Sequence, residues 1–184
     1  PLVLTPEISD LLAEPFPMFV AKSTLVSRVH RRVNCDYIGI KKYDAEGKVN
    51  GEVRFLGLFT AEAYDETARS IPFVRRRVKK VIEASGAAPG GHTEKTVANL
   101  LETWPRDELF QTHSRALAPM IVGAMHLVGR PRTRLFLRRD EFDRFVTAIV
   151  FVPREAYDTA LRLRIADVLT RAYAGTLVKF QPYF

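Results

Sequence analysis

The feature that most constrains the fold is the stretch from Arg134 to Pro153, which predicts two strands joined by a tight polar turn. The first strand is expected over residues 133–138 and the second over residues 145–152. In the second strand, β-branched and aromatic residues follow one another without a break. Such a run is typical of a strand covered on both faces, so we expect it to be central in its sheet.

An amphipathic helix and a further strand are expected after this hairpin. Residues 158–174 place an apolar stripe, including Leu161 and Leu169, on one helical face, and Gly175 follows as the expected C-cap. The last strand is expected over residues 177–184. Because that sheet would run into the final residue with no closing element, we expect the chain to be a piece of a larger protein.

The first part of the chain predicts a second β-rich unit. Short apolar stretches at residues 2–4 and 19–20 favour brief strands, and residues 37–43 favour a longer one. Gly47 lies in the turn that follows, where a tight reversal needs positive φ. Residues 52–59 then return antiparallel, and their apolar side chains on both faces predict a buried strand.

The middle of the chain predicts three helices. Residues 71–85 carry valines and an isoleucine at helical spacing, and Thr93 is the expected N-cap of the next helix. Pro105 is expected to end that helix. Residues 114–128 form a third, broadly apolar helix, in which Pro119 predicts a kink or a later start. The expected organisation is therefore α+β, with a sheet in residues 1–66, helices in 67–130 and a sheet in 131–184.

Composition restricts the possible partners. The net charge is +7 and the pI is about 9.8, so a nucleic acid or a membrane surface must be considered. No apolar run approaches the roughly 18 residues that span a bilayer, so we expect no membrane partner. Cys35 is the sole cysteine. It is expected to be a packed or half-exposed thiol, and the absence of any intrachain disulfide favours a reducing compartment, the cytoplasm.

Each of two charged clusters could be either a binding site or an ordinary solvent-exposed surface. The basic run at residues 75–80 could contact phosphates, but it occupies the side of its helix opposite the valines, which favours a solvated face. Asp140, Glu141 and Asp143 could hold a hard cation, but flanking arginines favour a salt-bridged surface turn.

The sequence predicts no active site in this chain. Its histidines show neither the pair spacing nor the neighbouring ligands of a metal or catalytic site: His30, His92, His113 and His126. Nucleotide-binding glycine motifs, a nucleophile elbow and a zinc-protease motif are also absent. We therefore predict no catalytic, cofactor-binding or metal-binding residue.

Several blocks of sequence, in the same order along the chain, resemble the large bacterial NAD-specific glutamate dehydrogenases. One is LETWPRDELFQ at residues 101–111, and the similarity runs from about residue 20 to residue 184. The other blocks are at residues 27–31, 36–44, 55–60, 71–72, 134–146 and 152–159.

The resemblance implies a position in the non-catalytic N-terminal half of such an enzyme. It implies two partial ACT-like (ferredoxin-like) antiparallel sheet modules, residues 1–66 and 131–184, joined by a helical linker. The parent would convert L-glutamate, NAD and water into 2-oxoglutarate, ammonia and NADH, with NAD bound outside this chain. This segment would serve regulation, oligomer contacts or both.

The partners expected on this basis are the rest of the parent enzyme, further copies in a homo-oligomer, and an amino-acid effector. The exposed edges at residues 133–138 and 177–184 would need a partner or a cover. Two alternatives remain open at this point. One is a basic nucleic-acid-binding module, although no specific nucleic acid is expected, and the other is a standalone amino-acid-sensing ACT-type protein.

Overall fold

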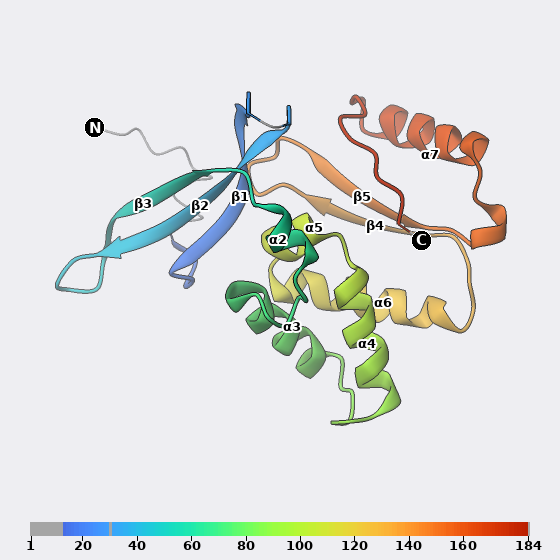
Figure 1. Cartoon of the computed structure of the whole chain (residues 1–184), viewed down its shortest axis with the longest axis horizontal. Helices are drawn as coiled ribbons and strands as arrows, with labels where there is room; N and C mark the ends of the chain where they lie inside the picture. The colour runs from blue at the N-terminus through green and yellow to red at the C-terminus, as the bar shows by residue number, and fades with distance from the viewer. Residues whose placement is uncertain (1–12, 30, 184) are drawn as a thin grey trace.

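The computed structural model describes residues 13–29 and 31–183, and it is an α+β fold with two antiparallel sheets (Figure 1). The first sheet has the strand order β1-β2-β3, and β4 pairs with β5 in the second. Helices lie between the two sheets in the sequence. The elements are β1 (Met18–Val26), β2 (Asn34–Tyr43), β3 (Val49–Gly57), α2 (Ala61–Asp65), α3 (Pro72–Ala84), α4 (His92–Thr103), α5 (Arg106–Gln111), α6 (Ser114–Val128), β4 (Arg134–Arg139), β5 (Val146–Phe151), a 3-10 turn (Arg154–Ala156) and α7 (Thr159–Ala172).

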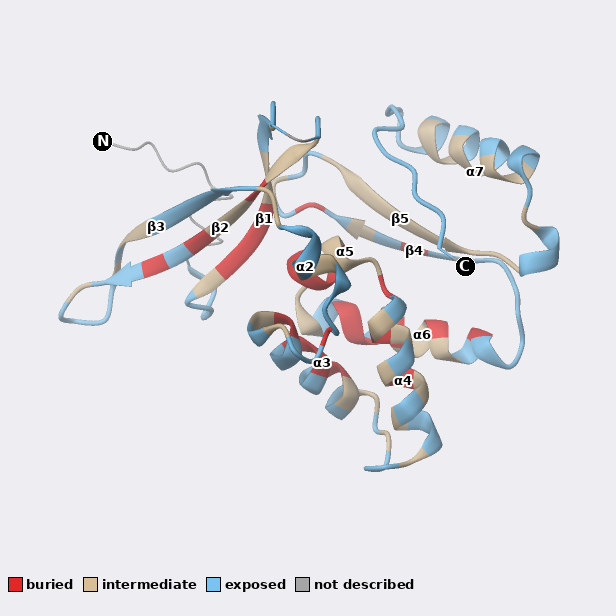
Figure 2. Ribbon diagram, in the orientation of Figure 1, coloured by how far each residue is buried: buried red, intermediate tan, exposed pale blue. Residues whose placement is uncertain are grey.

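The core lies among the helices, and both sheets contribute to it through one face. Val74 of α3, Leu101 of α4 and Ile121 of α6 are fully buried. Val20 of β1 and Phe136 of β4 belong to the same cluster. Buried residues on the helices and along β1 and β2 are red in Figure 2. One continuous core therefore holds the two sheets to the helical unit.

The predicted first hairpin is confirmed, but the expected burial of its returning strand is wrong. β2 and β3 pair through a turn in which Gly47 has a φ of 79°. Val53, Phe55 and Leu56 of β3 are 43%, 54% and 50% exposed. β3 is an edge strand of the sheet among the described residues, and it extends away from the helices (Figure 1), so little packs against it. The strand expected at residues 19–20 is the middle of β1, and that at residues 2–4 lies outside the described residues.

The predicted helices are present, with one correction at the start of α4. α4 begins at His92 with Gly91 as its N-cap, so Thr93 lies inside the first turn. Glu94 in the same turn reaches back past the N-cap, and its carboxylate accepts the N–H of Gly90 at 2.6 Å. α6 spans Ser114–Val128 as predicted and contains Pro119, so the helix does not start later, and the kink at Pro119 stays a prediction.

The C-terminal part of the chain, from β4 onward, differs from expectation in three respects. β5 pairs only with β4 in the described part of the chain, and its residues are half-buried, so it is not central. Residues 177–183 follow β5 and α7 without forming a strand. At the end of α7 the positive φ, 47°, belongs to Ala174 and not to Gly175. The division into residues 1–66, 67–130 and 131–184 stays a prediction.

Candidate functional site

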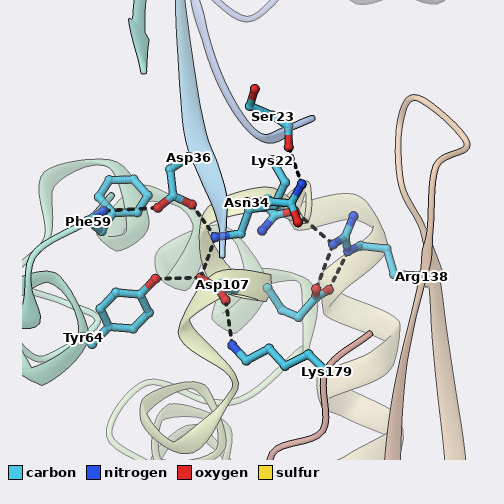
Figure 3. Close-up of polar contacts among 11 residues, drawn as sticks. Lys22, Ser23, Asn34, Asp36, Phe59, Tyr64, Asp107, Arg138 and Lys179 are labelled. Carbon is cyan, nitrogen blue, oxygen red and sulfur yellow. Dashed lines mark hydrogen bonds and ion pairs between the residues drawn. The ribbon is translucent and has the colours of Figure 1, made fainter. Parts of the chain in front are cut away.

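A group of connected polar side chains centres on the short helix α5 (Figure 3), and we call it the α5 junction. Its members are Lys22, Asp36, Tyr64, Arg77, Asp107, Glu108, Arg138 and Lys179. Asp107 and Glu108 follow each other in its first turn and reach different parts of the molecule. Asp107 faces the first sheet, α2 and the C-terminal segment, whereas Glu108 faces β4. Pro105 precedes the helix and Trp104 ends α4, so a sharp change of direction brings these two carboxylates to the junction.

Asp107 binds three groups from three segments. Its Oδ1 accepts a hydrogen bond from the Tyr64 hydroxyl at 2.9 Å and lies 3.4 Å from the Lys22 ammonium. Its Oδ2 lies 3.6 Å from Nζ of Lys179. Asp107 thus connects β1, α2 and the segment after α7.

Lys22 bridges Asp107 to a second carboxylate, Asp36 of β2. The Lys22 ammonium is 2.5 Å from Oδ1 of Asp36, and Oδ2 of Asp36 accepts the N–H of Phe59 at 3.1 Å. Asp36 is 5% exposed. A carboxylate this deeply buried requires a charged partner and further donors, which Lys22 and the Phe59 amide supply.

Glu108 forms a two-pronged ion pair with Arg138 of β4. Nε and Nη2 of Arg138 donate to the two Glu108 oxygens at 2.5 and 2.7 Å. Thr112 donates its hydroxyl to Glu108 at 3.1 Å, and the Glu108 side chain is 5% exposed. This geometry fixes the second sheet to α5 by both charge and direction.

The C-terminal end of α5 is held by Arg77 of α3. Nη1 of Arg77 donates to the carbonyl oxygens of Leu109 and Phe110 at 2.9 and 2.7 Å. The guanidinium also lies over the Phe73 ring, 4.5 Å from its centroid. A cation is favourable at a helix C-terminus, where carbonyl groups lack partners within the helix.

The electrostatics of the α5 junction keep its groups in fixed protonation states. Burial alone would raise the pKa of Asp107, but Lys22, Tyr64 and Lys179 outweigh it and hold the pKa below its usual value. Burial, reinforced by Asp107, raises the pKa of Tyr64. Burial lowers the pKa of Arg77 to about 10, so it stays charged at neutral pH.

These states suit positioning and not proton transfer. A general acid or base works best with a pKa near the operating pH, whereas Asp107 stays ionised and Tyr64 stays protonated. One surface hollow lies at the β1–β2 connection, beside Val26 and Arg28, and another lies beside Glu62 at the start of α2. Neither is lined by residues of the α5 junction.

The charged clusters singled out in the sequence have mostly local roles. Asp140 pairs with Arg144 at 2.7 Å and Asp143 pairs with Arg139 at 2.8 Å, which confirms the salt-bridged turn. Glu141 lies 3.0 Å from Nε2 of His113. Among residues 13–29 and 31–183, no group of three or more His, Cys, Asp or Glu is arranged to hold a metal ion.

The basic run on α3 is solvated except at one position. Arg75, Arg76, Lys79 and Lys80 are exposed, as expected, but Arg77 is buried and holds α5. Cys35 is a half-buried free thiol. His92 begins α4 and His126 lies in the last turn of α6, whereas His30 lies outside the described residues.

Sequence reasoning missed the α5 junction as a unit. No role in a site was expected for Asp107 or Glu108, and Arg138 is one of the arginines expected only to flank the polar turn. The available signal was an acidic pair in a short segment directly after Trp104-Pro105, too close to the preceding helix to be solvated on all sides. Lys22 and Tyr64 carried no comparable signal.

In the part of the chain that the structure describes, no helix is long and apolar enough to cross a membrane. Family models match two stretches. Residues 71–130 match the model for glutamate dehydrogenase, helical motif 1, and residues 134–184 match the model for the glutamate dehydrogenase ACT2 domain. The first match contains α3 to α6, and the second contains β4, β5 and α7.

Three relatives carry the name NAD-specific glutamate dehydrogenase. The Halomonas elongata protein is 42% identical over 171 residues, which are 92% of this chain and 11% of that protein. The Pseudomonas aeruginosa protein is 38% identical over 94% of this chain and 11% of its own length. The Mycobacterium tuberculosis protein is 33% identical over 78% of this chain and 9% of its own length. This chain therefore spans about a tenth of the length of these relatives, and it belongs to the large bacterial NAD-specific glutamate dehydrogenase family, in the region of helical motif 1 and the ACT2 domain.

Proposed function

We propose that this chain is a non-catalytic segment, regulatory and oligomer-forming, in the N-terminal half of a large cytoplasmic NAD-specific glutamate dehydrogenase. The parent enzyme oxidises L-glutamate with NAD and water to 2-oxoglutarate, ammonia and NADH. NAD binds elsewhere in the parent. The similarity to proteins named as NAD-specific glutamate dehydrogenases supports the parent activity.

The observation that carries the non-catalytic role is the use of the buried charges. Asp36, Asp107, Glu108 and Arg138 bind one another or neighbouring donors across different elements. Groups committed to such pairs hold elements together, and releasing one of them for chemistry would leave its partner buried and unpaired. The α5 junction is therefore a structural centre.

The outer face of the second sheet supports a role in contacts. Leu135 and Leu137 of β4 point away from the core side occupied by Phe136, and they are 43% and 39% exposed. α7 has no buried residue, and Val178 beyond it is 82% exposed. Apolar surface of this kind is expected to be covered by the rest of the parent enzyme, by another copy or around an amino-acid effector.

The test uses the full-length enzyme with Leu137→Asp, which places a charge on this outer face. Arg139→Asp, on the same face of the same strand, is the matched control at a position that is already polar. We expect Leu137→Asp to lower the mass measured by light scattering or to weaken the response to added L-amino acids. The kcat of the assembled fraction should stay within about twofold, whereas loss of a general acid or base costs about 10²-fold or more.

Two results would contradict the proposal. One is a mass and an amino-acid response that stay unchanged in Leu137→Asp. The other is a large fall in kcat while the mass and the thermal stability stay the same, because that would place this segment in the catalytic machinery.

A further inference from the structure

Among the described residues, the strand β3 has no partner on its outer side. It is one of the two outer strands of its sheet, and its apolar side chains Val53, Phe55 and Leu56 are about half exposed. Figure 1 shows it on the side of the molecule away from the helices. An exposed apolar edge strand is a template for pairing with another strand.

The hydrogen-bond pattern shows which groups this edge offers. The N–H of Lys41 in β2 donates to the carbonyl of Pro17 at 2.8 Å, so Lys41 faces β1 and its even-numbered neighbours face β3. Val53 pairs with Ile40, one of these even-numbered residues, so the backbone N–H and C=O groups of Val53 point toward β2. Glu52 and Arg54, on either side of it, therefore direct their N–H and C=O groups to the free edge.

We propose that β3 pairs antiparallel with β3 of a second copy of this chain, about a two-fold axis at Val53. This register places Val53 opposite Val53 of the second copy, at a position without mutual backbone bonds. Glu52 then lies opposite Arg54 of the second copy, and Arg54 opposite its Glu52, at the positions that exchange hydrogen bonds. The two side chains already form an ion pair within one strand at 2.5 Å, so pairing produces a four-membered network of alternating charge.

The apolar side chains of the strand match the same register. Phe55 would lie opposite Gly51 of the second copy, and a Cβ added at Gly51 would have no atom within 4 Å, so there is room for the ring. The sheet already contains this arrangement, because Phe19 covers Gly39 so closely that a Cβ there would lie 2.3 Å from Cζ of Phe19. Aromatic cover of a strand glycine stabilises sheet pairing.

Neighbouring registers are disfavoured by like charges. An axis at Glu52 places the two Glu52 carboxylates opposite each other, and an axis at Arg54 does the same with two guanidinium groups. Only the Val53 axis among these three alternates the charges. Such self-complementarity within one strand is what an isologous contact requires, which favours a second copy over an unrelated segment.

This inference rests on the proposed oligomer-forming role and specifies one of its contacts. The test is intermolecular disulfide formation by Val53→Cys in the full-length protein, which also carries Cys35→Ser. The full-length protein with Cys35→Ser alone is the blank. Facing residues at such a position have Cα atoms about 4.5 Å apart, which a disulfide can bridge. Leu56→Cys is the matched control, since Leu56 is similarly exposed but lies about 20 Å from its equivalent in this register.

We expect an intermolecular disulfide in Val53→Cys and none above the blank in Leu56→Cys. Adding Glu52→Arg should lower the yield about tenfold by opposing two cations, and adding Arg54→Glu as well should restore it. Equal cross-linking by Leu56→Cys would overturn the inference. The inference would also be overturned if the thiol of Val53→Cys neither cross-linked nor reacted with an alkylating reagent, because another segment would then cover β3.

The two proposals fail separately. If Val53→Cys does not cross-link while Leu137→Asp still changes the mass at unchanged kcat, the β3 pairing is wrong and the oligomer-forming role stands. If kcat falls in Leu137→Asp at constant mass, the proposed function is wrong whatever the cross-linking result.

Discussion

At the scale of single residues, Lys22 and Asp107 carry the connection between the first sheet and the helices. Lys22 lies between two carboxylates, 2.5 Å from Asp36 and 3.4 Å from Asp107, and its side chain is 17% exposed. Partly buried ions are stable only when their partners and hydrogen bonds are complete. Each of these three residues therefore depends on the other two for a stable position.

The first prediction concerns the pH dependence of the Asp107 contacts. The pKa of Asp107 is lower in the folded protein than its usual value of 3.8, so the unfolded chain binds the proton more tightly. The stabilisation is therefore complete above about pH 3.8 and is lost as the pH falls through the folded pKa. In urea titrations from neutral to acid pH, Asp107→Asn should show a smaller loss of unfolding free energy in this acid range than wild type.

Asp143→Asn is a matched control, because Asp143 forms an exposed pair with Arg139 and its side chain is 62% exposed. Its acid profile should follow that of the wild type. An Asp107→Asn profile that also coincides with wild type would show that Lys22, Tyr64 and Lys179 do not hold this carboxylate as described.

At the scale of elements, α7 depends on its ends because it has no fully buried residue. Asp158 is the N-cap, and its carboxylate accepts the N–H of Leu161 at 2.6 Å. At the other end, Gly175 donates to Thr170 and Ala174 donates to Arg171, which is a Schellman motif. Ala174 occupies the position of this motif that has a left-handed backbone conformation and is usually a glycine.

We predict that Asp158→Ala destabilises α7 by about 1 kcal/mol, because it removes the acceptor for the first turn. Asp158→Ser keeps an oxygen at this position and should lose much less. Amide hydrogen exchange of residues 159–163 measures the effect locally. Asp167→Ala, on the exposed side of the same helix, should leave the protection of the first turn unchanged, and equal protection in Asp158→Ala would contradict the cap.

The elements also show how far the sequence determines the fold. Local periodicity predicted α3, α6, α7 and both hairpins, because these patterns depend on neighbours a few residues apart. Three predictions were wrong: that β3 is buried, that β5 is central in its sheet, and that residues 177–184 form a strand. Those features depend on what packs against a strand from elsewhere, and an apolar run does not distinguish a covered strand from an edge awaiting a partner. The α5 junction was missed for the same reason, since its members come from β1, β2, α2, α3, α5, β4 and the segment after α7.

At the scale of the whole molecule, the apolar core and the polar contacts of the short helix α5 together hold the two sheets to the helices. Asp107 connects α5 to the first sheet, Glu108 connects it to the second, and Arg77 connects it to α3. Much of the apolar surface outside this core is exposed, on β3, β4 and α7. A rigid centre with uncovered apolar edges is what we expect of a segment that positions larger parts of an enzyme.

The most direct test of this account is the kcat of the full-length enzyme carrying Tyr64→Phe. Tyr64, Asp107 and Lys22 are the group in this chain that most resembles a catalytic set, and here they are assigned to positioning alone. NADH formation at saturating glutamate and NAD should stay within about twofold of wild type, with unfolding free energy lowered by about 1 kcal/mol through the lost hydrogen bond. A fall in kcat of about 10²-fold, at unchanged mass and stability, would show that this segment takes part in the chemistry.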